Sequence, residues 1–120
     1  MGAQGVTTVT FGAFPGTTDC TTVITGQTGI GAGSAVEAWI ICTATSDHSA
    51  DEHWVDPPEV TAGNIVAGTG FTIYAMGNPG SIEPNYNMGL VVNNKSYPNA
   101  ATGIITPMPY GAWTVGWCWN

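Results

Sequence analysis

The sequence predicts an all-β domain, built as a two-sheet sandwich of the jelly-roll or immunoglobulin-like kind. Short runs rich in Val, Ile, Thr and aromatic residues recur along the chain, and Gly, Pro and Asn separate them. Within the best runs, apolar side chains alternate with a period of two, which is typical of strands. The 120 residues are also about the size of one domain, so we expect a single domain over 1–120.

Three strands are expected in the first part of the chain. Residues 6–11, VTTVTF, are rich in β-branched side chains, and residues 21–25 follow the turn-like PGTTD and end at Gly26. The clearest strand is 35–43, AVEAWIICT. One of its faces carries Val36, Ala38, Ile40 and Cys42, and the other carries Glu37, Trp39 and Ile41. A fully apolar face opposite a mixed face predicts a strand that is central in one sheet.

Three more strands are expected in the second part. They are the short run 59–63, the alternating run 71–76 and the carboxy-terminal run 111–120. Between them, residues 77–110 are rich in Pro, Asn and Gly, and only GLVV and GIIT look β-like. We expect 77–110 to be an extended loop or arm, because long irregular segments in compact domains usually serve an interaction.

Charge is scarce and almost entirely negative. Only 8% of residues are charged, the net charge is −7, and Lys95 is the single basic residue. Nucleic acids and anionic membranes are therefore not expected as partners, since both need clustered Lys and Arg. Free proteins usually carry far more surface charge, so the composition favours a component of an assembly over an isolated monomer, and we expect a homo-oligomer.

 The amino terminus has neither a basic region nor an apolar block, so we expect no secretory signal, and we expect synthesis in a cytoplasm.

Both histidines and four of the eight acidic residues lie within residues 45–58, TSDHSADEHWVDPP. Zinc or calcium binding is not expected, because the spacing of His48 and His53 brings the two rings together on no regular element and the calcium-loop pattern is missing. The G-x-S-x-G motif that would support a Ser–His–Asp triad is missing, so we do not expect an enzyme. We also expect no cofactor. The stretch instead predicts a hydrated connection with one helical turn, capped by Ser46.

Three of the five tryptophans lie on one face of the last expected strand, together with Val115. They are Trp113, Trp117 and Trp119. Such a stripe is typical of a core or a subunit interface, and an open stripe would suit stacking on sugar rings. The three cysteines, Cys20, Cys42 and Cys118, are an odd number and predict small buried apolar side chains instead of disulfides.

Residues 36–75 and 111–120 resemble a set of small virion structural proteins of tailed bacteriophages. The shared pattern is VEAWI, ADEH, AGNIVAGTGFTIYA and WTVGWCW, and it leaves out the segment 77–99, which looks like an insertion. The resemblance implies a virion component on the capsid surface, with the major capsid protein or other virion proteins as partners and a homo-oligomer, such as a trimer, as its form. Either a capsid decoration (cement) protein or a head or tail fibre module is expected, and a carbohydrate-binding module that uses the Trp stripe is the alternative.

An intersubunit contact is expected at the charged stretch and the Trp stripe. A face with four carboxylates would repel an identical face and would accept Lys or Arg from a different partner. Histidines at such a contact would make assembly sensitive to acid. The expected interface residues are Asp47, His48, Asp51, Glu52, His53, Trp54, Asp56, Trp113, Trp117 and Trp119.

Overall fold

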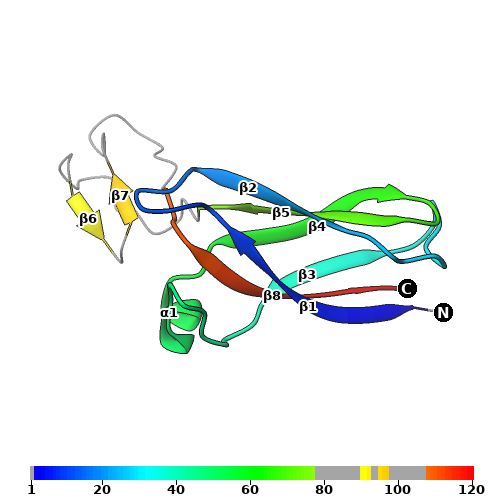
Figure 1. Ribbon diagram of the computed structural model, residues 1–120, viewed down its shortest axis with the longest axis horizontal. Coiled ribbons are helices and arrows are strands. Elements are labelled where there is room, and N and C mark those ends of the chain that lie inside the picture. The colour runs from blue at the N-terminus through cyan, green and yellow to red at the C-terminus, as the bar shows by residue number, and fades with distance from the viewer. Residues whose placement is uncertain (1, 78–89, 93–94, 98–107) are drawn as a thin grey trace.

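The computed structural model describes residues 2–77, 90–92, 95–97 and 108–120, and these are mostly β-structure (Figure 1). One antiparallel sheet has the order β1-β8-β3, with β1 at Ala3–Thr10, β8 at Ala112–Trp119 and β3 at Val36–Ile40. A second has the order β2-β5-β4, with β2 at Asp19–Ile24, β5 at Gly70–Met76 and β4 at Glu59–Val66. Strands β6, Leu90–Val92, and β7, Lys95–Tyr97, pair separately, and the helix α1 is Ala50–Val55. The predicted all-β class is confirmed.

The expected strands all form. Several of them extend further than the sequence predicts, whereas the strand expected at 35–43 covers only 36–40. Of the two β-like pieces in the expected arm, GLVV contains β6, whereas GIIT lies outside the described residues. Most of the expected arm 77–110 likewise lies outside them.

The prediction that 35–43 is a central strand is wrong. The carboxy-terminal strand β8 is central, because Trp119 is paired with Ala3 on β1 and with Val36 on β3. Strand β3 lies at an edge of the sheet as described. The mixed pattern of its second face was misleading, because alternation reports which side chains are buried and does not report how many strands pair with the backbone.

The buried side chains of the two three-stranded sheets form one core. Phe71, Ile73 and Ala75 of β5 face it from one sheet, and the Trp stripe of β8 faces it from the other. Trp113, Trp117 and Trp119 are only 3%, 9% and 7% exposed. The interpretation of the stripe as core is therefore confirmed, and the open platform for sugar rings is wrong, because these ring faces already pack inside the domain.

The expectation of three buried cysteines is also wrong. Cys42 is exposed, and Cys20 and Cys118 are half-buried. Cys42 follows the end of β3, where the backbone leaves the sheet, so the alternation that would have buried it no longer applies.

Candidate interaction surface

Strand β8 continues past the end of β3, and this leaves part of its edge to be completed by other groups. The last backbone hydrogen bond on this side runs from the N–H of Ile41, just after β3, to the Thr114 carbonyl, at 3.0 Å. Further toward the start of β8, the backbone groups of Ala112 and the N–H of Thr114 face the same edge. Buried backbone groups need partners, and here residues 45–53 provide them.

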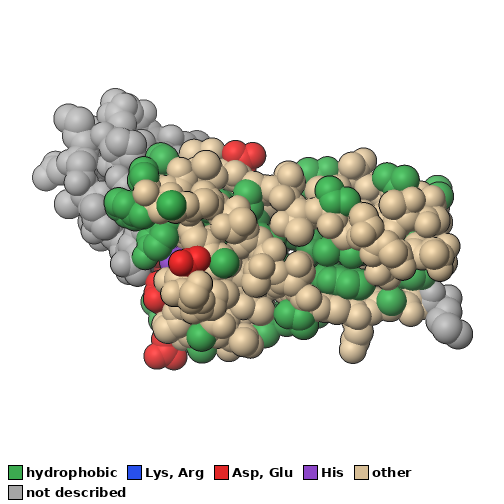
Figure 2. All heavy atoms as spheres, in the orientation of Figure 1, with side chains coloured by type: hydrophobic (Ala, Val, Ile, Leu, Met, Phe, Trp, Pro, Cys, Tyr) green, Lys and Arg blue, Asp and Glu red, His purple; other side chains and the backbone are tan. Residues whose placement is uncertain are grey.

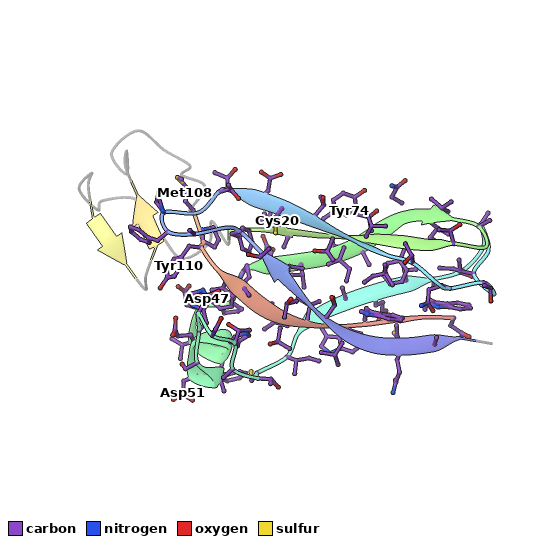
Figure 3. The ribbon with its side chains drawn as sticks, viewed as in Figure 1. Cys20, Asp47, Asp51, Tyr74, Met108 and Tyr110 are labelled. Atoms are coloured by element: carbon purple, nitrogen blue, oxygen red, sulfur yellow. The ribbon has the colours of Figure 1, made fainter. Side chains whose placement is uncertain are left out.

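Three side chains of the charged stretch complete this edge. The Thr114 N–H donates to His53 Nε2 at 3.0 Å, and the Ala112 N–H donates to Asp47 Oδ2 at 2.8 Å. The hydroxyl of Thr45 donates to the Ala112 carbonyl at 2.7 Å. The stretch is thus attached to β8 by side chains that replace the missing strand, and it is more than a hydrated connection. Figure 3 shows Asp47 on the side of α1 that faces β8.

The N-cap of the helix α1 is Ser49, and the prediction of Ser46 as its N-cap is wrong. The Glu52 N–H donates to the Ser49 hydroxyl at 3.2 Å, and the Ser49 N–H donates to Glu52 Oε1 at 3.1 Å. This reciprocal pair is a capping box, which stabilises the first turn of a helix. Ser46 lacks the Glu or Gln three residues later that completes the box, and Ser49 has it in Glu52.

Both histidines pack against the Trp113 ring, although no single regular element carries the two of them. His48 stacks on Trp113 with ring centroids 3.9 Å apart and planes at 22°. His53 packs against the same ring with centroids 4.9 Å apart. His48 precedes the N-cap and His53 lies inside the helix. The change of backbone direction at Ser49 brings the rings together.

Hydrogen-bond partners define the protonation of His53. Its Nδ1 lies 2.7 Å from the Ser49 carbonyl, which only accepts, so Nδ1 carries the hydrogen. Its Nε2 accepts from the Thr114 N–H and therefore carries none. The ring is 1% exposed. A hydrogen on Nε2 would point at the Thr114 N–H, and these two donors would then face each other. The hydrogen bonds in the structure thus correspond to the Nδ1–H tautomer of this ring.

His48 has acceptors at both ring nitrogens. Its Nε2 lies 2.6 Å from the Tyr110 carbonyl, and its Nδ1 lies 2.8 Å from Glu52 Oε2. A hydrogen must therefore lie between Nδ1 and the carboxyl group. Because the side chain also stacks on Trp113, the geometry favours an imidazolium ring paired with a Glu52 carboxylate.

Partial burial acts to raise the pKa of Glu52, but hydrogen bonds from His48 and from the Ser49 N–H outweigh it. The charge of His48 adds to this effect, and the pKa of Glu52 lies below its ordinary value of 4.5. A carboxyl group whose pKa is lowered by folding stabilises the fold above the pKa of the unfolded chain. That contribution is lost as the pH falls through the lower pKa of the folded state.

We expect Glu52→Gln to reduce the loss of stability that the protein suffers below about pH 4.5. The variant keeps the shape of the side chain but has no carboxylate to protonate, so part of the acid dependence disappears. Urea unfolding at pH 7, 5 and 3 measures this, with Glu37→Gln, at an exposed position of β3, as the control. An identical fall in stability for the wild type and Glu52→Gln between pH 5 and pH 3 would contradict the expectation.

The outer side of α1 carries exposed apolar and acidic side chains. Trp54 is 78% exposed and Val55 is 67% exposed, although both belong to a helix held tightly against β8. Asp51 is exposed and Asp56 is half-buried. We call these four residues the α1 surface. Figure 3 shows Asp51 at the end of the helix that points away from both sheets, and Figure 2 shows carboxylates grouped at this end of the molecule.

The expected interface residues thus divide into two groups. Seven of them face inward or bond within the chain, because they pack in the core or hold the charged stretch against β8, and they are Asp47, His48, Glu52, His53, Trp113, Trp117 and Trp119. Asp51, Trp54 and Asp56 belong to the α1 surface, and their role in an interface stays a prediction. Sequence reasoning missed Val55, which belongs beside Trp54, and Thr45, whose hydroxyl also accepts from the N–H groups of Asp47 and His48.

Within the parts of the chain that the structure describes, no group of three or more His, Cys, Asp or Glu side chains is placed to hold a metal ion. Over the same residues, no helix has the length and apolar character needed to cross a bilayer. No protein-family model, curated protein or solved structure matches the chain.

Proposed function

We propose that this chain is a capsid decoration protein of a tailed bacteriophage, which binds the phage head through the α1 surface and stabilises it. The resemblance of residues 36–75 and 111–120 to small virion structural proteins motivates the virion role. We further propose that the two sheets form a sandwich of the jelly-roll or immunoglobulin-like kind. Such a fold presents loops and short helices at its ends, where a small protein contacts neighbouring subunits.

The observation that carries the binding role is the exposure of Trp54 on a rigidly held helix. Trp is the side chain most enriched among residues that dominate binding energy. Its neighbour Val55 extends the apolar area, and the capping box and His53 hold the helix in place before any partner binds. A surface that is ordered in advance loses little conformational entropy on binding.

The acidic side chains around Trp54 indicate the chemistry of the partner. Asp51 is exposed and lies three residues before Trp54 on the same helix, so a complementary site would combine an apolar pocket with a basic rim. Two copies of the α1 surface would repel each other for the same reason. We therefore assign this surface to the major capsid protein, and we assign contacts between copies of this chain to other faces.

The proposed function is tested by removing the protein from virions. Particles that lack it should release their DNA at lower temperature and burst more readily on osmotic shock than wild-type particles. Adding the purified protein back should restore both properties. Particles that are unchanged in heat and osmotic resistance would contradict the decoration role, and loss of adsorption to host cells instead would favour a fibre module.

A further inference from the structure

A second candidate binding site lies on the outer face of the β2-β5-β4 sheet. Phe71, Ile73 and Ala75 of β5 face the core, so Tyr74 and Met76 face outward. A cavity of about 300 Å³ opens at this end of the sheet. Its lining includes Asp19, Glu59, Thr61, Tyr74 and Met76. In Figure 3, Tyr74 and the α1 residue Asp51 lie on opposite sides of the molecule.

The strand register places one carboxylate on each side of the apolar Met76 side chain. Met76 of the central strand pairs with Asp19 on β2 and with Glu59 on β4. Neighbouring strands lie about 4.8 Å apart, so a group seated over Met76 has one carboxylate on each side. Tyr74 lies two residues along the same strand and presents its ring to the same face.

We propose that this cavity binds a lysine or arginine side chain of a partner protein. The aliphatic stem of such a side chain would pack on Met76, and its cationic end would lie between Asp19 and Glu59, near the face of Tyr74. Aromatic faces and carboxylates both attract cations. The proposal goes beyond attachment through the α1 surface and does not depend on it.

Charge complementarity is the argument for a basic partner. Asp19 accepts from the Thr18 hydroxyl at 3.1 Å, which orients its carboxylate. Its negative charge already affects a neighbour, because burial and then the charge of Asp19 raise the pKa of Cys20 to about 11. The chain has a single basic residue, Lys95, so a cation for this cavity has to come from outside unless Lys95 supplies it.

The test uses small probes and the full-length protein. Nα-acetyl-lysine methylamide is titrated into protein labelled with ¹³C at the methionine methyl groups, and the Met76 signal is assigned by its absence in Met76→Leu. Nα-acetyl-norleucine methylamide, which has the same stem without the ammonium group, is the matched control. We expect the lysine probe to shift the Met76 signal in a saturable, salt-sensitive way, and we expect the norleucine probe to shift it much less.

Variants then separate the two carboxylates from general effects of charge. Asp19→Asn and Glu59→Gln should each weaken binding of the lysine probe about fivefold. Glu37→Gln removes one negative charge from the other sheet and should leave binding unchanged. Equal shifts with both probes, or unchanged binding in both cavity variants, would overturn the proposal. Tighter binding to Lys95→Gln would assign the cavity to the chain's own lysine and would overturn an external partner.

Discussion

Replacing His53 by alanine should lower the free energy of unfolding by about 3 kcal/mol. The ring is 1% exposed and packs against Trp113, so its removal leaves a cavity. It also leaves the buried Thr114 N–H without its partner and removes the side-chain hydrogen bond to the Ser49 carbonyl. For a domain of this size the melting temperature should fall by roughly 10 °C.

Urea unfolding at pH 7.5 measures this loss, and two variants show its origin. Trp54→Ala, one residue further along the same helix, should change stability by less than about 0.5 kcal/mol, because Trp54 is 78% exposed. His53→Gln has a side-chain oxygen that can accept from the Thr114 N–H, so it should recover part of the loss. A His53→Ala protein within about 1 kcal/mol of the wild type would show that His53 does not hold α1 against β8.

Replacing Trp54 by alanine should weaken attachment to phage heads by about 30-fold or more. The variant removes the largest exposed side chain of the α1 surface and leaves the buried contacts of His48 and His53 in place. Binding of the purified protein to heads that lack it measures the effect, and circular dichroism confirms that the variant is folded.

Trp39→Ala is the matched control for this experiment. Trp39 is also exposed, at 42%, but it lies on β3 and covers Gly116 of the neighbouring strand. It should attach like the wild type, apart from a modest loss of stability. Asp51→Asn should weaken attachment a few-fold at low salt and much less at high salt. Full attachment by Trp54→Ala together with loss of attachment by Trp39→Ala would move the binding surface to the first sheet.

The strands could be predicted from the sequence because alternation reports burial directly. The pattern of Trp113, Trp117 and Trp119 placed these side chains on one face, and that face is the core. The centrality of β8 could not be predicted in the same way. Pairing depends on which strands meet, and the sequence of 35–43 is compatible with a central or an edge position.

The contacts of the charged stretch could not be predicted from local sequence patterns. Its acids and imidazoles suggested solvent exposure. Asp47 and His53 instead bond to backbone groups of Ala112 and Thr114, more than 60 residues away along the chain. The capping box of Ser49 and Glu52 is a local signal that could have located the start of the helix.

The copy number of this protein in purified virions tests the central claim most directly. A decoration protein attached to the major capsid protein should be present in numbers comparable with that protein, as measured by quantitative gel analysis or mass spectrometry. The same preparation from a phage carrying Trp54→Ala should contain far fewer copies. A handful of copies per particle, or none, would contradict the account.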